Sequence, residues 1–464
     1  MKTSRHALSL HPLAACLALA FGVLDAGAVP PRTAVVVQNC LDHGAGSLRQ
    51  AIIDDTTSTP IDLTQLSCSG ITLTTGSLYV QRAQLIKGPG AAAFTISGAN
   101  LDRVFTQTSA QPLALYGMTI RNGYSQSGGG CVYSAGTLQL NDTVVSNCRS
   151  FDLGSSSTLK GGGVLVHDTL LAINSAIVDN KVYSALGIAI GGGAAVGGTA
   201  LLDHSTISRN VVSSASGNLA MSGGIDVTGT LNMMASTVSD NRSSGVPGAP
   251  GVVGGARALY GATIMQSTIS GNSAEGGIGG LSLYASTSTP IQVTESTISG
   301  NSASATSGLA ARGALAITNS TIAFNVETGP SNRGAVHISY SFADIESTII
   351  AANVSANGQA QNVGLGLSGS ITGAHNLLGS SPSVTLPPGT IGGDPMLLPL
   401  HANGGPTKTH ALRPGSPAVN AGSNAGGYPN DQRDTGYPRV IGPFADIGAF
   451  EGVEADSIFY SGFD

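Results

Sequence analysis

The sequence has no tryptophan, and only 10% of its 464 residues are charged and 5% are aromatic. Because large rings are scarce, a core built from this chain must be narrow and filled by small aliphatic side chains. No window keeps an apolar period of 3.6 residues, which argues against an architecture of amphipathic helices. The chain is instead rich in glycine, with 65 residues, and glycine supplies turns that need a positive φ.

The first 28 residues have the pattern of a signal peptide. Lys2 and Arg5 give a positive start, residues 13–24 are apolar, and Ala26-Gly27-Ala28 offers a small-residue cleavage site. We therefore expect an exported protein that is secreted or held at the outer cell surface. Residues 13–16, Leu-Ala-Ala-Cys, also resemble a lipoprotein cleavage box, so lipidation remains an alternative.

The charge of the mature chain argues against two classes of partner. Removing Lys2 and Arg5 from the 20 basic residues leaves 18, and removing Asp25 from the 26 acidic residues leaves 25. A net negative chain of this kind predicts no basic patch for nucleic acid or for an anionic membrane. No apolar run of about 18 residues follows the signal peptide, so we expect no transmembrane helix.

One phrase, Ser-Thr-Ile-Ser-x-Asn, recurs along the chain. Clear copies begin at Ser205, Ser236, Ser267, Ser296 and Ser320. Looser copies stand before and after them. The asparagines that close the copies are Asn147, Asn180, Asn210, Asn241, Asn272, Asn301, Asn325 and Asn353. Their spacing of 24 to 33 residues is typical of a solenoid, a propeller or an array.

The contents of each repeat favour one of these architectures. A Gly-Gly pair is followed by short segments of alternating Val, Ile, Leu and Thr, which predict about three strands per repeat. Stacked repeats would form three parallel sheets around one core, a right-handed parallel β-helix of the all-β class. A propeller blade needs a longer repeat and four strands, so it ranks second. We interpret the recurrent asparagines as a structural ladder of stacked amides.

Four cysteines remain in the mature chain, and an even number in an exported protein suggests disulfides. Four cysteines allow three pairings. Proximity in sequence favours Cys40 with Cys68 and Cys131 with Cys148. A metal site is less favoured, because the cysteines lack close pairs and neighbouring histidines.

Both ends of the solenoid need a cap. Ser47 fits the N-cap of a short amphipathic helix with Leu48, Ala51 and Ile52 on one face. Eleven of the 21 prolines lie between Pro382 and Pro443, which predicts a turn-rich C-terminal cap. The expected parts are a signal peptide (1–28), an N-terminal cap (29–70), β-helix repeats (71–380), a C-terminal domain (381–452) and a sorting-like tail (453–464).

Three segments resemble known families. The segment NCLDHGAGSLRQAI resembles the N-terminal CSLREAI segment of secreted bacterial β-helix proteins, with Gln50 in place of glutamate and the cysteine upstream at Cys40. Residues 391–451 are similar to the choice-of-anchor Q domain, through motifs such as Asn403-Gly-Gly-Pro-Thr407 and Asp446-Ile-Gly-Ala-Phe-Glu451. The last nine residues resemble endings found on exported proteins of some Gram-negative bacteria. These resemblances imply a pectate-lyase-like solenoid and surface sorting, without a shared activity.

Candidate functional residues are few. Asp226 and Arg257 fall at outward positions of adjacent repeats and are the best candidates for contact with a sugar. Two sequence-adjacent pairs, Asp203-His204 and His167-Asp168, should point to opposite faces of a strand. In the C-terminal domain, we expect an internal network of hydrogen bonds and ion pairs that involves Asp431, Arg433, Asp446 and His410.

Two functions of different class follow. The preferred one is an exported, surface-associated β-helix with a non-catalytic, adhesin-like or structural role. The alternative is a carbohydrate-active enzyme, a lyase or a hydrolase, that acts on an acidic polysaccharide and would need clustered carboxylates or a base beside a charge neutraliser. The sequence predicts no cofactor and no metal, and the partner is open between a polysaccharide and another cell-surface ligand.

Overall fold

The computed structural model describes residues 33–154, 158–215, 219–244, 252–285, 289–340, 342–382 and 384–452. The predicted signal peptide and the sorting-like tail from residue 453 lie outside these ranges.

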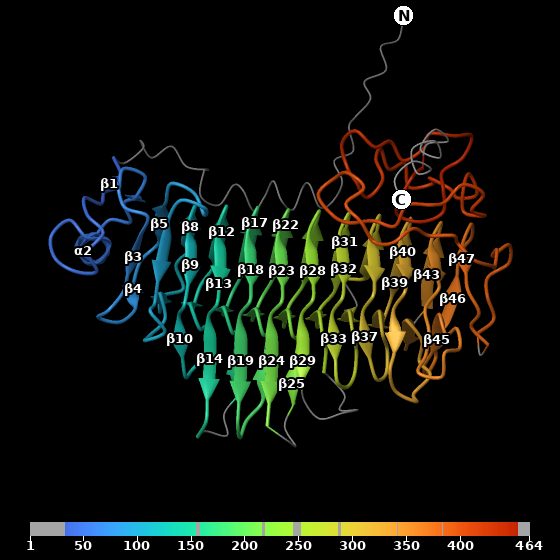
Figure 1. Cartoon of the computed structure of the whole chain (residues 1–464), viewed down its shortest axis with the longest axis horizontal. Coiled ribbons are helices and arrows are strands. Elements are labelled where there is room, and N and C mark those ends of the chain that lie inside the picture. Colours follow the sequence, from blue (N-terminus) through green and yellow to red (C-terminus); the bar gives the residue numbers. More distant parts are fainter. Residues whose placement is uncertain are drawn as a thin grey trace, which may run out of the picture.

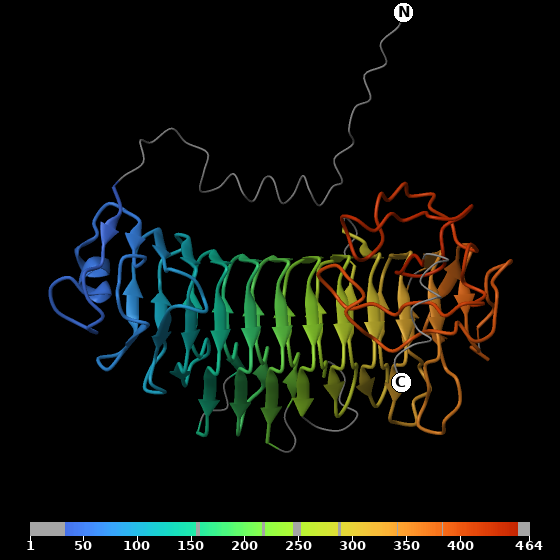
Figure 2. The same ribbon diagram turned by 45° about the horizontal axis from the view of Figure 1, so that its top comes forward.

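The chain winds as a parallel β-helix, as predicted (Figures 1 and 2). One coil consists of β11 (Val132–Ser134), β12 (Leu138–Asn141) and β13 (Val144–Ser146), and each strand pairs in parallel with its counterpart in the next coil. Repetition of this unit gives sheets of 11, 13 and 12 strands, respectively.

Side-chain alternation explains why these short strands form a common core. In the 12-stranded sheet the central residue of each strand points inward, and the pairing places these residues in one column, each at most 1% exposed. The column comprises Ile96, Ile120, Val145, Ile177, Ile207, Val238, Ile269, Ile298, Ile322 and Ile350. Full burial of one such side chain stabilises the fold by about 1.5–3 kcal/mol. The Ile of the repeated phrase is therefore the core position.

The asparagines of the phrase form a buried ladder along the coils. The Oδ1 atom of Asn210 accepts from the backbone N–H and from Nδ2 of Asn180, both at 3.0 Å, and Asn241 receives the same two bonds from Asn210. Nδ2 of each amide also donates to a backbone carbonyl, such as that of Ile177 for Asn210. The residue before each asparagine has a left-handed backbone conformation, as Asp179 does with a φ of 59°.

Asn147 is not part of this ladder, and that expectation was wrong. Asn147 is exposed, with φ 54°, and occupies the left-handed turn position that Asp179 takes in the next coil. The ladder position belongs to Cys148, whose backbone N–H donates to Asn180 Oδ1 at 3.0 Å. The looser copy ends in Ser-Asn-Cys, so the asparagine stands one residue before the structural position. The ladder also continues past Asn353 to Asn362.

In the described residues of the N-terminal cap, one short helix forms, α2 (Leu48–Asp54). Ser47 is its N-cap and accepts from the backbone N–H of Gln50, while Leu48 and Ile52 are buried against the solenoid core. Disulfides join Cys40 with Cys68 and Cys131 with Cys148, with Cα atoms 6.5 Å and 5.4 Å apart. No helix in the described ranges is long and apolar enough to cross a membrane.

A side extension, which we call the fin, projects from the middle coils. Its outer layer belongs to an eight-stranded sheet that includes β14 (Arg149–Asp152), β19 (Lys181–Ser184), β24 (Val211–Ser214) and β29 (Arg242–Ser244). Its inner layer is β15 (Leu159–Lys160), β20 (Ala189–Ile190) and β25 (Ala220–Met221). Leu159, Val182, Ala189, Val212 and Ala220 make a small core between the layers. The fin appears below the main coils in Figure 1.

The C-terminal part extends beyond its predicted role as an end cap. Val384 and Leu386 pack against the solenoid core, as a cap should. The rest folds back along the 12-stranded sheet and lies over several coils (Figures 1 and 2). There it bonds the outward hydroxyls of Thr268, Thr297 and Thr321. The hydroxyl groups that the repeat places outside are thus used to hold this segment.

Candidate functional site

The side chains of Asp226 and Arg257, the predicted sugar contacts, form an ion pair with each other. They stand in register on β26 (Ile225–Val227) and β30 (Ala256–Ala258), where Arg257 Nε lies 2.7 Å and Nη2 3.1 Å from the two carboxylate oxygens. Ser222 donates a third bond to Asp226 Oδ2 at 2.7 Å. The two side chains are only 6% and 14% exposed. A carboxylate so engaged is a structural ion-pair partner within the wall of the solenoid.

The sequence-adjacent pair Asp203-His204 does not divide between two faces, contrary to expectation. His204 Nδ1 lies 2.8 Å from Asp203 Oδ1. His204 has φ 47° and begins the turn after β22 (Ala200–Asp203), so strand alternation ends at Asp203. In the other pair, the His167 ring makes a T-shaped contact with the Tyr133 ring, with ring centroids 5.4 Å apart.

The predicted polar network of the C-terminal part exists and is larger than expected. Arg433 Nη2 lies 2.7 Å from Asp431 Oδ2, and Asp446 accepts from the backbone N–H groups of Asn420 and Gly452. His410 bonds Ser299 of the solenoid at 2.8 Å. Arg439, the residue at the centre of this network, was not predicted from the sequence, because it lies in no recognisable motif.

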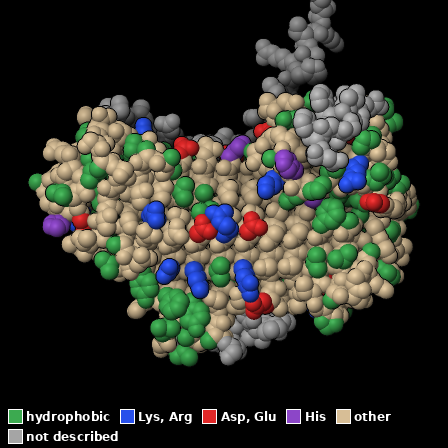
Figure 3. Space-filling view, viewed as in Figure 1, with side chains coloured by type: hydrophobic (Ala, Val, Ile, Leu, Met, Phe, Trp, Pro, Cys, Tyr) green, Lys and Arg blue, Asp and Glu red, His purple; other side chains and the backbone are tan. Residues whose placement is uncertain are grey.

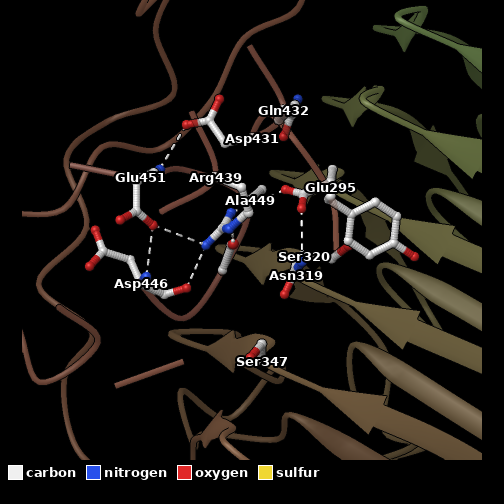
Figure 4. A network of polar contacts seen from close by, with 12 residues as sticks. Glu295, Asn319, Ser320, Ser347, Asp431, Gln432, Arg439, Asp446, Ala449 and Glu451 are labelled. Carbon is white, nitrogen blue, oxygen red and sulfur yellow. Dashed lines mark hydrogen bonds and ion pairs between the residues drawn. The ribbon is translucent and has the colours of Figure 1, made fainter. Parts of the chain in front are cut away.

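Arg439 lies between two buried carboxyl groups (Figure 4). Its Nη1 is 3.1 Å from Oε2 of Glu295, which belongs to the solenoid, and its Nη2 is 3.4 Å from Oε2 of Glu451. Burial raises the pKa of Glu295 to about 8, although Arg439 and Asn319 act in the opposite direction. Burial likewise raises the pKa of Glu451 to about 7. This network fixes the C-terminal part to the coils and is closed to solvent.

Exposed Lys and Arg side chains lie in a row over the fin, with hydrophobic side chains beside them (Figure 3). The pairing of β14 with β19 sets Arg149 beside Lys181 and Phe151 beside Tyr183. Both cationic side chains are exposed, and the two rings stack with centroids 4.7 Å apart and planes 24° apart. Leu153 and Leu186, which come just after these two strands in the sequence, are 68% and 55% exposed. We call Arg149, Lys181, Phe151 and Tyr183 the fin patch.

The fin patch differs from neighbouring charges in lacking an acidic partner. Arg209 binds Asp179 at 2.8 Å, and Arg242 binds Glu275 at 2.6 Å. Within the described residues, neither Arg149 nor Lys181 has a side-chain hydrogen bond or ion pair. Like charges directly opposite on neighbouring strands destabilise a sheet. Strand pairing thus joins two cations that are separate in sequence. The absence of a basic patch for nucleic acid or an anionic membrane stays a prediction.

Residues suited to hold a metal do not gather in the described ranges: no group of three or more His, Cys, Asp or Glu side chains lies together.

Comparisons with known proteins assign this chain to no family. No family model matches it, and no curated protein matches it. The resemblances of its end segments therefore remain predictions. Among solved structures, it is similar to the crystal structure of pectate lyase Pel9A, at 13% sequence identity and a TM-score of 0.40, over 90% of this chain and 97% of that one. At this level the similarity says nothing about activity.

Proposed function

We propose that this is an exported, surface-associated β-helix protein that binds an acidic polysaccharide without cleaving it. Export is the function of the predicted signal peptide, residues 1–28, and attachment is that of the choice-of-anchor Q-like part with its tail. The solenoid is a rigid body that displays the binding surface. The fin patch is the binding surface.

The observation that carries this proposal is the register of Arg149 with Lys181 beside the stacked rings of Phe151 and Tyr183. Neighbouring strands lie about 4.7–4.9 Å apart, so two positive charges face solvent at short range. A polyanion bound across them relieves their mutual repulsion and forms charge-assisted hydrogen bonds. Adjacent aromatic side chains add apolar contact to the C–H faces of sugar rings. Clustered carboxylates on a polysaccharide match this combination.

The hydrogen bonds that engage the Asp226 carboxylate support a non-catalytic role over the alternative of a lyase or hydrolase. A general base or nucleophile must reach the substrate. Both carboxylate oxygens of Asp226 are bound by Arg257, and one is also bound by Ser222. The fin patch consists of two cationic and two aromatic side chains, and it includes no carboxylate that could act as a base or nucleophile.

Binding to polygalacturonate, measured by gel retardation and calorimetry, tests the proposal. The double variant R149Q/K181Q should bind about tenfold more weakly or worse, because it loses two charge-assisted contacts. Wild-type affinity should fall as salt rises. The matched control is R82Q/K87Q, which removes the same charge from two exposed positions elsewhere and should bind as the wild type does. Equal losses in both variants would show that net charge, and not the fin patch, attracts the polymer.

A depolymerisation assay on the same polymer separates the binding protein from an enzyme. We expect no release of new sugar ends by the wild type. Turnover that disappears in both Asp226→Asn and Arg257→Gln would overturn the non-catalytic assignment. Fractionation of the native cell into medium, outer membrane and periplasm tests export, and recovery from the cytoplasm alone would contradict it.

A further inference from the structure

A second exposed group of planar side chains lies on the 11-stranded sheet, which does not carry the fin patch. Tyr79 is the outward residue of β4 (Leu78–Val80), and Tyr133 is the outward residue of β11. Between them lies β7 (Phe105–Gln107), which pairs with both and places Thr106 in register with the two tyrosines. The tyrosines are therefore two strand spacings, or roughly 10 Å, apart along the solenoid axis.

Other side chains extend this group into a row. The Arg103 guanidinium lies over the Tyr133 ring, 5.5 Å from its centroid. On the other side of Tyr133, the His167 ring meets it edge to face at 5.4 Å. Tyr79 is 60% exposed, and His167 is exposed as well. We call Tyr79, Arg103, Tyr133 and His167 the aromatic row.

The aromatic row favours a ligand without charge. Arg103 is its one permanent cation, and two of its five N–H donors are engaged within the protein. Nε donates to the Gly128 carbonyl at 2.9 Å, and Nη2 donates to Ser127 Oγ at 2.5 Å. Asp102, the preceding residue, also acts electrostatically on Arg103. What the row offers to solvent is ring surface. In the described residues, the phenol hydroxyls of Tyr79 and Tyr133 have no hydrogen-bond partner.

The spacing of the row selects among uncharged ligands. In a β-1,4-linked glycan the chain is a ribbon in which every second sugar presents the same face. Its repeat is thus two linked rings, similar in length to the roughly 10 Å between Tyr79 and Tyr133. Sugar C–H faces pack on aromatic rings, and free phenol hydroxyls can bond sugar hydroxyls.

We propose that the aromatic row is a second binding site, which takes an uncharged β-1,4-linked glycan along the solenoid axis. This inference does not depend on the fin patch. If both sites bind, one rigid body holds two polysaccharides of different charge, and the protein cross-links them with the avidity of a two-site binder.

Retardation of the mature protein in gels that contain hydroxyethyl cellulose tests the site. The wild type should be retarded. Tyr79→Ala and Tyr133→Ala should each weaken binding about fivefold to tenfold, with Tyr79→Ala the cleaner variant because its ring is mostly exposed. Tyr260→Ala is the matched control, since Tyr260 is 58% exposed and lies outside the row, and it should bind as the wild type does.

Two further arms separate this site from the fin patch. R149Q/K181Q should keep its retardation by hydroxyethyl cellulose, and saturating polygalacturonate should leave it unchanged. Competition between the two polymers would overturn the inference of a separate site. A folded wild-type protein that runs unretarded, or equal retardation of Tyr79→Ala, Tyr133→Ala and wild type, would overturn the aromatic row as a binding site.

Discussion

Nη1 of Arg439 lies 3.1 Å from Oε2 of Glu295, although 144 residues separate them in sequence. Both side chains are buried, at 0% and 2% exposure. The same guanidinium donates to the backbone carbonyls of Gly448 and Asp446 within the C-terminal part. Arg439 thus ties the C-terminal part to a turn of the solenoid, in addition to the hydrogen bonds with Thr268, Thr297 and Thr321.

Replacing Arg439 tests this relationship. In Arg439→Gln, the carboxyl group of Glu295 and the backbone carbonyls of Gly448 and Asp446 lose a buried donor. A buried acceptor left unsatisfied costs about 1–3 kcal/mol, so we expect a loss of about 3 kcal/mol or more in the free energy of unfolding. Urea denaturation followed by circular dichroism measures it. Arg413→Gln, at an exposed position of the same segment, is the control and should lie within about 0.5 kcal/mol of the wild type. Similar stabilities of the two variants would contradict a buried tie.

The raised pKa values of Glu295 and Glu451 predict that stability falls as pH rises. The pKa of Glu295 rises from 4.5 to about 8 and that of Glu451 from 4.5 to about 7. The folded protein therefore binds more protons than the unfolded chain between these values. The resulting stabilisation is fully present below pH 4.5 and is lost as pH rises through 7 and then 8.

Denaturation series between pH 5 and 8.5 measure this slope. Glu295→Gln cannot ionise, so its stability should vary less with pH than that of the wild type. Glu275→Gln removes an exposed carboxyl group and should keep the wild-type slope. Burial lowers the pKa of His337 and His410, which gives the wild type an opposing slope near the acidic end, so the difference between wild type and Glu295→Gln is the decisive quantity. If the two proteins have the same pH dependence, the pKa of Glu295 is not raised in the folded protein.

The coils of this fold could be predicted from the sequence, because each coil carries the same short residue pattern at a regular spacing. The Ile of the repeated phrase recurs at the spacing of one coil, and its column is the core. The tie between Arg439 and Glu295 could not be read, because it depends on how a segment without period folds back. Asp226 and Arg257 were correctly placed on adjacent strands, yet alternation alone cannot tell a free side chain from a paired one. The fin patch was missed because Arg149 and Lys181 become neighbours only through strand pairing.

The corrected position of the asparagine ladder gives a pair of variants that should behave differently. Asn241→Ala leaves the Ile207 carbonyl and the Asn210 N–H without their buried partners, at about 1–3 kcal/mol each. Asn147→Gly alters an exposed left-handed turn position and should cost under about 0.5 kcal/mol. Thermal unfolding separates the two. A costly Asn147→Gly would restore that residue to the ladder.

Asp226→Ala distinguishes a structural carboxylate from a sugar-binding one. Removing it leaves Arg257 without its partner at 14% exposure, so we expect a loss of about 1–3 kcal/mol in stability. Asp142→Asn, at an exposed turn position, is the control and should be neutral. Affinity for polygalacturonate should stay at the wild-type level in both variants, because the fin patch is on another sheet. Loss of affinity with unchanged stability in Asp226→Ala would mean that a ligand, rather than Arg257, is the main partner of this carboxylate.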